Sequence, residues 1–182
     1  MRRLVPLLVL ALLVVGCGSS EPKSAGAPGR SAERLLAGAP RPLARLHAEA
    51  NRLLDGGAAG FRRRLAELRG YPVVVNKWAS WCGPCRAEFP MFQKQALARG
   101  KRVAFLGVDG NDNDGDAKAF LRQFPVSYPS YRDPNLKISA AFKAVGFPAT
   151  VFYDSKGELA FVHQGGYATE RTLAEDIARY AR

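Results

Sequence analysis

The segment that most constrains the fold is a strongly β-forming run that leads directly into two closely spaced cysteines. Residues 72–78, PVVVNKW, are apolar and β-branched, which predicts a central strand buried on both faces. Apolar residues at helical spacing follow from Gly83 to Arg99, and Gly100 is expected to end that helix. Cys82 and Cys85 stand between the strand and the first turn of the helix. The sequence therefore predicts that a buried strand delivers a cysteine pair to a helix N-terminus.

Strands and helices alternate through the rest of the chain. β-Branched and aromatic runs predict strands, and apolar residues at helical spacing predict helices. The expected strands lie at 102–108, 149–154 and 158–164, with a short extended piece at 126–130, and the expected helices lie at 117–124, at 136–145 and from Thr169 onward. The DSKG stretch supplies a turn between the last two strands. A strand–helix–strand unit followed by a hairpin indicates an α/β sandwich.

The N-terminus has the form of an export signal. Arg2 and Arg3 precede an apolar run over 4–15, which Gly16 and Cys17 follow. A membrane-spanning helix needs roughly 20 residues, so this shorter run favours a cleaved signal over a permanent span. The ending VVGC resembles the lipobox of bacterial lipoproteins, which implies a signal peptide at 1–16 and a lipid on Cys17 that holds the protein at the outer face of a cell membrane. An ordinary secretory signal with a chance cysteine is the alternative.

The region between this signal and the cysteine pair divides into two parts. Residues 17–42 are rich in small and helix-breaking residues, which predicts a lipid-anchored flexible linker. Apolar residues then recur at helical spacing on either side of a Gly-Gly break, at Leu43, Leu46, Ala50 and Leu53 and again at Phe61, Leu65 and Leu68. We therefore expect an N-terminal helical extension at 43–69 and the main domain at 70–182.

Positive charge is concentrated close to the expected anchor. The formal net charge is +11 at pH 7, and residues 30–69 hold nine arginines against four acidic residues. A basic surface beside a lipid anchor favours attraction to anionic lipid headgroups over binding of nucleic acid. A basic surface that is only solvated is the alternative.

Export also limits what the cysteines do. An exported protein lies in an oxidising compartment, and a lipidated Cys17 leaves Cys82 and Cys85, of three cysteines, for chemistry. Cys82 is expected at the first turn of the helix, where unpaired N–H groups and the helix dipole stabilise a thiolate. Cys85 follows three residues later on the same face. This arrangement predicts that an exposed Cys82 attacks a substrate disulfide and that a buried Cys85 resolves the mixed disulfide.

The sequence around the pair resembles a known family. WCGPC resembles the active site of thioredoxins, and VVNKWASWCGPCRAEFP resembles more specifically their exported, membrane-anchored TlpA/ResA branch. The resemblance covers residues 70–182 and implies a thioredoxin fold, with a central mixed sheet flanked by helices and the helix–strand insert of this branch at 110–134. GFPAT, at 146–150, resembles the family's loop with a cis-proline, here Pro148.

The resemblance implies roles for individual residues. The expected catalytic residues are Cys82, Cys85 and Glu88, and the expected substrate-binding residues are Trp81, Gly83, Pro84, Phe147 and Pro148. Glu88 falls on the position of an active-site glutamate, where a carboxylate would disfavour a second negative charge on the cysteines. A solvated helix residue is the alternative for Glu88. Trp81 is expected to form an exposed lip beside Cys82, whereas Trp78 is expected to be buried.

Two neighbouring residues raise separate questions. Asn76 lies where cytoplasmic thioredoxins place a buried aspartate, and this replacement matches the exported branch. Lys77 departs from the family, in which phenylalanine is usual at this position. Whether its charge is paired or reaches the surface stays open at this point.

The function implied by the resemblance is that of an extracytoplasmic thiol-disulfide oxidoreductase. Gly83 and Pro84 place no charge between the cysteines, whereas oxidants of this fold often have histidine there, so reduction of protein disulfides is favoured. The family implies a membrane thiol-reductase as the electron donor and apocytochrome c maturation as one destination. We expect a monomer without a cofactor or nucleic-acid partner. The alternatives are a binding lipoprotein with a structural disulfide and a disulfide oxidase or isomerase.

Metal-binding alternatives find little support in the sequence. Zinc requires four ligands, and only His47 and His163, on separate elements, accompany the cysteine pair. Copper delivery would call for wider cysteine spacing and a suitably placed histidine. The acidic run at 109–116 does not match an EF-hand, because the register ends on Leu121 instead of glutamate. We expect this run to cap the next helix.

A peroxiredoxin is the remaining alternative of similar fold. Such a protein would carry proline and threonine or serine at the seventh and third positions before its reactive cysteine. Val75 and Ala79 stand at these positions before Cys82. The sequence therefore argues against peroxide chemistry.

Overall fold

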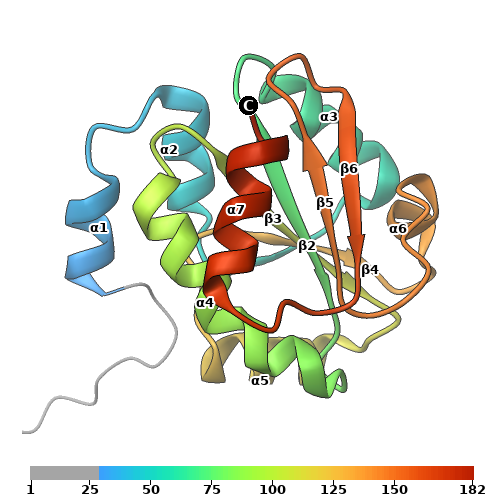
Figure 1. The fold of residues 1–182 in the computed structure, drawn as a ribbon. Helices are drawn as coiled ribbons and strands as arrows, with labels where there is room; N and C mark the ends of the chain where they lie inside the picture. The colour runs from blue at the N-terminus through green and yellow to red at the C-terminus, as the bar shows by residue number, and fades with distance from the viewer. Residues whose placement is uncertain (1–28) are drawn as a thin grey trace, which may run out of the picture.

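A six-stranded mixed sheet forms the centre of the protein in the computed structural model, which describes residues 29–182 (Figure 1). In chain order the strands are β1 (Leu53–Leu54), β2 (Val73–Trp78), β3 (Ala104–Gly110), β4 (Ser130–Asp133), β5 (Ala149–Tyr153) and β6 (Leu159–Gln164). Their spatial order is β1-β4-β3-β2-β5-β6. The first four in this order pair in parallel, whereas β5 pairs antiparallel with β2 and β6. The predicted interior position of β2 is confirmed.

Helices cover both faces of this sheet. Within the described residues they are α1 (Arg30–Leu36), α2 (Arg41–Ala48), α3 (Gly57–Glu67), α4 (Gly83–Arg99), α5 (Asp114–Gln123), α6 (Lys137–Ala141) and α7 (Glu170–Tyr180). Side chains of α4, α5 and α7 form one apolar core with the sheet, and those of α2, α3 and α6 form a second on the opposite face (Figure 1). The structure is the predicted α/β thioredoxin-like fold with N-terminal helices.

Alternate residues of β2 supply both cores. Val74 and Trp78 pack with α4 and α5, and Val73 and Val75 pack with α2 and α3. All four are at most 1% exposed, and full burial of such side chains contributes roughly 1.5–3 kcal/mol each. The predicted burial of this strand on both faces is confirmed, and it fixes the position where the cysteine pair begins.

The structure differs from the linker prediction over the second half of that segment. Arg30–Leu36 form α1, which contacts α4 instead of belonging to a flexible tether. Ala32 and Leu36 are buried at a spacing of one helical turn, and Leu36 lies against Gly100 at the end of α4. A side chain on Gly100 would collide with Leu36, since its Cβ would lie 2.7 Å from Leu36 Cδ2. The signal peptide, Cys17 and the first part of the linker lie outside the described residues.

A second difference concerns the end of the first predicted N-terminal helix. The helix was expected to reach Leu53, but α2 ends at Ala48 and Leu53 pairs with β4 as part of β1. Asn51 causes this change of direction, because its positive φ of 60° is incompatible with a continuing helix. Its backbone N–H donates to the carbonyl of Tyr128 and so ties the turn to the segment before β4.

The elements of the predicted insert are present with one shift. The helix begins where Asn113 caps it by accepting a hydrogen bond from the backbone N–H of Asp116, so the predicted capping role of the acidic run is confirmed. The extended piece expected at 126–130 lies later, as β4. No helix within residues 29–182 has both the length and the apolar character that crossing a membrane requires.

Candidate active site

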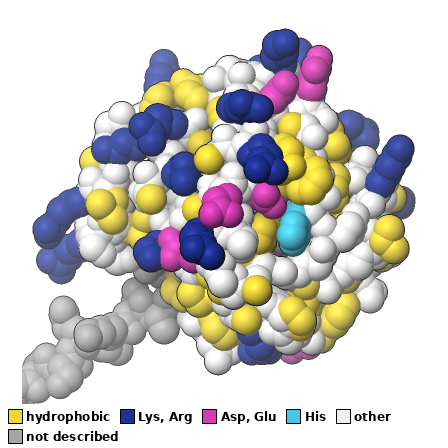
Figure 2. Space-filling view, in the orientation of Figure 1, with side chains coloured by type: hydrophobic (Ala, Val, Ile, Leu, Met, Phe, Trp, Pro, Cys, Tyr) yellow, Lys and Arg dark blue, Asp and Glu magenta, His cyan; other side chains and the backbone are white. Residues whose placement is uncertain are grey.

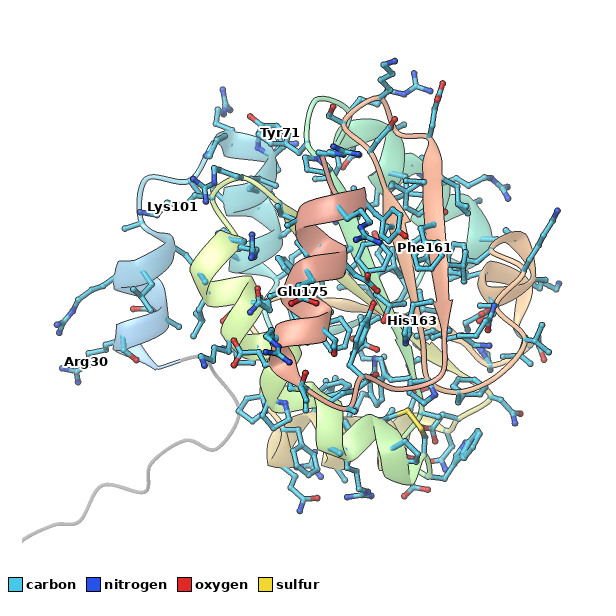
Figure 3. The ribbon with its side chains drawn as sticks, viewed as in Figure 1. Arg30, Tyr71, Lys101, Phe161, His163 and Glu175 are labelled. Atoms are coloured by element: carbon cyan, nitrogen blue, oxygen red, sulfur yellow. A yellow bond between two sulfur atoms is a disulfide. The ribbon has the colours of Figure 1, made fainter. Side chains whose placement is uncertain are left out.

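The two cysteines form a disulfide at the N-terminus of α4. Cys82 is the N-cap residue, and its Sγ accepts a hydrogen bond of 3.2 Å from the backbone N–H of Cys85. The disulfide is drawn in yellow at the lower right of Figure 3, and Arg30 of α1 is at the left of the same view. In the reduced protein, the same N–H and the dipole of α4 would stabilise a thiolate on Cys82.

Cys82 is less accessible than the sequence suggested. It was expected to be exposed, but it is 3% exposed, whereas Cys85 is completely buried. Bonding to the buried Cys85 holds the sulfur of Cys82 inward, between the exposed residues Trp81 and Gly83. Cys82 is still the more exposed of the two cysteines, as predicted, since Cys85 has no surface open to solvent.

An aspartate fixes the backbone immediately before the pair. Oδ2 of Asp112 accepts a hydrogen bond from the backbone N–H of Ser80, and Oδ1 accepts one from the Ser80 hydroxyl at 2.9 Å. The Ser80 carbonyl accepts a further bond of 2.9 Å from the guanidinium of Arg86. Side chains from the loop after β3 and from α4 thus hold the approach to Cys82 in one conformation.

An aromatic pair lies beside the disulfide. Trp81 is 56% exposed and donates through Nε1 to the carbonyl of Asn111, which confirms the expected exposed lip. The ring of Phe147 meets the Trp81 ring edge-on, with centroids 5.1 Å apart. The peptide bond between Phe147 and Pro148 is cis, as expected from the loop motif. Trp81 and Phe147, which are 66 positions apart in the chain, therefore share this surface.

Several of the predicted site residues meet around Gly166. A Cβ atom placed on this glycine would lie 3.3 Å from Cγ of Pro148, 3.6 Å from Oε2 of Glu88 and 3.7 Å from Cβ of Pro84. The backbone N–H of Gly165 also donates to the carbonyl of Pro148. The loop after β6 therefore brings together α4 and the cis-proline loop, two regions that the sequence had connected only through the resemblance.

Glu88 is a buried carboxyl group. It is 0% exposed, so the alternative of a solvated helix residue is wrong. Its Oε2 accepts a hydrogen bond of 3.1 Å from the backbone N–H of Tyr167, and its Oε1 has no hydrogen-bond partner within residues 29–182. Burial raises the pKa of Glu88 to about 7, partly offset by the bond from Tyr167. The group therefore changes charge near neutral pH, one helical turn from Cys85.

Two further polar groups are buried near the site. Asn76 is 1% exposed beside the hydroxyl of Tyr128, whose pKa is raised by burial. Asp109, at the end of β3, is 4% exposed, and burial followed by the charge of Asp112 raises its pKa to about 8. Asp109 thus keeps its proton at neutral pH, which limits repulsion within the acidic loop.

The structure answers the question about Lys77. Its Nζ is not at the surface, because the residue is 1% exposed, and it donates a hydrogen bond of 2.9 Å to the carbonyl of Ala144. The same nitrogen lies 4.1 Å from the centroid of the Phe147 ring. The sequence contained no signal for either contact, since both partners lie on a loop about 70 residues away.

The histidines weighed as zinc ligands lie apart. His47 is on α2, whereas His163 is on β6, where its ring stacks on Tyr167 with centroids 4.1 Å apart (Figure 3). In the part of the chain that the structure describes, no three His, Cys, Asp or Glu side chains are grouped so as to hold a metal ion.

Comparison with known proteins places the chain in a family. Residues 49–162 match the AhpC/TSA family, and this match covers more than half of the chain. The chain belongs to the AhpC/TSA family. Within this AhpC/TSA member, the peroxiredoxin positions are occupied by Val75 and Ala79, which are both buried and carry no hydroxyl group.

Several relatives of this AhpC/TSA member are thiol-disulfide oxidoreductases. It is 29% identical over 138 residues to the thiol-disulfide oxidoreductase ResA of Halalkalibacterium halodurans, covering 75% of this chain and 78% of the relative. It is 29% identical over 111 residues to ResA of Oceanobacillus iheyensis, covering 59% of this chain and only 57% of that relative's length. The crystal structure of a secreted Mycobacterium tuberculosis disulfide oxidoreductase homologous to E. coli DsbE matches 63% of this chain and 85% of its own, with 28% identity and a TM-score of 0.57.

Proposed function

We propose that this protein is an extracytoplasmic thiol-disulfide oxidoreductase that reduces disulfide bonds in proteins. The observation that carries the proposal is the Cys82–Cys85 disulfide at the N-terminus of α4, with Cys82 alone reaching solvent. The names of the ResA and DsbE-like relatives support this reaction class. Trp81, Gly83, Pro84, Phe147 and Pro148 form the proposed substrate surface.

The reaction divides into two exchange steps. In the reduced protein, the thiolate of Cys82 attacks one sulfur of the substrate disulfide, which forms a mixed disulfide and releases the other substrate sulfur as a thiolate. Cys85, as its thiolate, then attacks the sulfur of Cys82. This second step forms the Cys82–Cys85 bond and releases the remaining substrate thiolate. Two electrons pass to the substrate, and the oxidised protein requires an external dithiol to regain its thiols.

The charges around Cys82 support reduction as the direction of exchange. Gly83 and Pro84 are exposed and uncharged, so they do not stabilise the thiolate beyond what the helix N-terminus provides. About 30 mV in a two-electron couple corresponds to about 1.4 kcal/mol, so a modest difference in thiolate stability decides between reductant and oxidant. We assign the protein as a reductant, supplied with electrons by a membrane thiol-reductase, with apocytochrome c as one destination.

The proposed location is the outer face of the cell membrane, with a lipid on Cys17. Lys and Arg side chains lie on the side of the protein that carries α1, as well as over the top and the right of the view (Figure 2). Attraction of these cations to anionic lipid headgroups would add to the hold of the lipid on Cys17. The disulfide lies away from α1 in the same orientation, so it would remain open to substrates (Figure 3).

A reductase assay tests this function directly. The protein should accelerate the reduction of insulin by dithiothreitol, followed as turbidity, and a Cys82→Ser variant should equal dithiothreitol alone. A purely structural disulfide, as in a binding lipoprotein, would give no acceleration over dithiothreitol alone. The reduction potential of the pair, measured against glutathione, then separates a reductant from a disulfide oxidase or isomerase.

A further inference from the structure

The ammonium group of Lys77 is buried, and it has few contacts that could offset the cost of removing its charge from water. It contacts the carbonyl of Ala144 at 2.9 Å and the face of the Phe147 ring at 4.1 Å, and no carboxylate within residues 29–182 lies within 4.0 Å of Nζ. Burial lowers the pKa of Lys77, and the charge of Asp133 acts in the opposite direction. Removing a charge from water costs several kcal/mol, so an apolar side chain would serve stability better at this position.

Both contacts of Lys77 belong to the loop that carries the cis-proline. Ala144 and Phe147 flank the exposed residues Val145 and Gly146, and Pro148 follows directly. β2 is an interior strand, paired on both sides, so the backbone of Lys77 is a fixed point from which its side chain reaches the loop. The ammonium thus joins the strand before the cysteines to the loop beside them.

The Phe147 ring is held on three sides. Lys77 lies over its face, Trp81 meets it edge-on, and the backbone of Gly110 approaches it closely. A Cβ atom on Gly110 would lie 2.8 Å from Cζ of Phe147, so only glycine leaves room for the ring at the end of β3. The position of Phe147 in turn determines which part of the Trp81 surface remains free.

We propose that Lys77 is a positioning residue for substrate binding, because its ammonium group holds Ala144 and Phe147 and thereby sets the loop that faces the disulfide. The proposal rests on the proposed function for its kinetic consequence, while its structural consequence is independent of any activity. The group itself touches neither the reacting sulfurs nor the substrate in this arrangement.

Lys77→Met tests the proposal, since methionine has similar length and no charge. A cation over an aromatic ring contributes an amount equivalent to roughly a 2- to 30-fold change in an equilibrium constant, so KM for insulin should rise by about that factor with kcat little changed. The rate at which dithiothreitol reduces the Cys82–Cys85 bond should stay the same. Lys77→Arg should restore most of the affinity, and Lys156→Met, at an exposed turn, is the control for lost charge.

Fluorescence quenching by acrylamide provides the readout that needs no activity. Trp78 is completely buried, so quenching reports on the 56%-exposed Trp81. Lys77→Met should increase this quenching, because Phe147 no longer stays against Trp81, and the free energy of unfolding should be equal or higher. If the wild-type protein fails to reduce insulin, the proposed function is wrong, and quenching still decides the role of Lys77.

Three results would overturn the proposal. The first is a Lys77→Met protein with unchanged KM and unchanged quenching. The second is a loss of stability with unchanged KM, which would make Lys77 a purely structural residue. The third is a raised KM with unchanged quenching, which would indicate a direct effect of the charge on the substrate.

If Lys77→Met does not fold, fluorescence quenching measured over a series of pH values tests the proposal instead. In the oxidised wild-type protein, quenching of Trp81 should rise as Lys77 loses its proton at alkaline pH. The arginine in Lys77→Arg stays charged, so quenching of Trp81 in this variant should not change with the protonation of residue 77. The other titratable groups to follow are Asp133, whose charge acts on Lys77, and Glu88 and Asp109, which have pKa values of about 7 and about 8. Lys77→Arg retains all three groups, so their titration appears in both curves. A wild-type curve that matches the arginine curve would contradict the proposal.

Discussion

The backbone N–H of Tyr167 donates a hydrogen bond to the carboxylate of Glu88, which lies 79 residues earlier in the chain. This bond joins the loop after β6 to the helix that begins with the cysteine pair. It also provides a hydrogen bond to a carboxyl group that is otherwise withdrawn from solvent. Burial of this group raises its pKa to about 7, and two consequences for the behaviour of the protein with pH follow from that burial.

The first consequence concerns stability. The folded pKa of Glu88, about 7, lies above its usual value of 4.5, so the folded state binds more protons between these values. The contribution of Glu88 to the free energy of unfolding is therefore fully present below about pH 4.5. It is lost as the pH rises to about 7, and the loss is roughly 3 kcal/mol. Glu88→Gln should remove that part of the loss in urea unfolding of the oxidised protein.

The matched control for this experiment is Glu158→Gln, at an exposed turn, which should retain the wild-type pH dependence. Asp109 loses its proton in the folded state near pH 8 and adds a separate fall in stability over an overlapping range. Asp109→Asn distinguishes the two contributions. A Glu88→Gln protein whose stability falls as steeply as the wild type would refute the assignment.

The second consequence concerns the cysteines. Glu88 is one helical turn from Cys85 on α4, and above about pH 7 its negative charge opposes a further negative charge on the reduced pair. In the reduced protein, Glu88→Gln should therefore let the thiolate form at lower pH, by roughly one unit. Thiolate absorbance against pH measures this shift. An unchanged curve would limit Glu88 to its bond with Tyr167.

Replacing each of the two cysteines should affect thiol-disulfide exchange in a different way. Cys82→Ser should abolish exchange, whereas Cys85→Ser should still attack and then accumulate covalent complexes with substrates, because no resolving thiol remains. Non-reducing gels detect these complexes, dithiothreitol disperses them, and mass spectrometry identifies the trapped partners. The double variant is the control. If Cys85→Ser trapped nothing and both single variants kept full insulin reductase activity, the roles of the cysteines would be wrong.

Asp112 is expected to stabilise the segment before the cysteines. Asp112→Ala leaves the buried backbone N–H of Ser80 without its acceptor, which should lower the free energy of unfolding by about 1–3 kcal/mol. The measurement belongs at about pH 6, where Asp109 stays protonated. Asp116→Ala, in the same acidic run but exposed, should cost less than about 1 kcal/mol. Equal losses in the two variants would contradict a specific role for Asp112.

The lipid anchor is tested by Cys17→Ser. Cleavage and lipidation at a lipobox depend on the cysteine, so the variant should stay uncleaved or become soluble on membrane fractionation. The lipid mass at the new N-terminus should also disappear. Recovery of the variant with the same N-terminus and the same lipid mass would exclude Cys17 as the anchor.

Local sequence determined the part of the site that surrounds the cysteines. A β-branched run, a tight turn and a segment with apolar residues at helical spacing specify strand, turn and helix within about thirty residues, and the structure has β2 and α4 at nearly the predicted bounds. The spacing of three residues places Cys82 and Cys85 on one turn of the helix, with Cα atoms 5.3 Å apart. These features follow from backbone geometry over a few residues, which is why the sequence alone predicts them.

Only the tertiary structure decided what surrounds this unit. Leu36 of α1 packs against Gly100 at the end of α4, and Leu53 pairs with β4 in the sheet. The charges of Glu88 and Lys77 depend in the same way on Tyr167 and on the loop at Phe147. Burial and pairing of this kind depend on which distant segments the sheet order brings together, and a local pattern of propensities contains no information about such contacts because they are absent until the chain has folded.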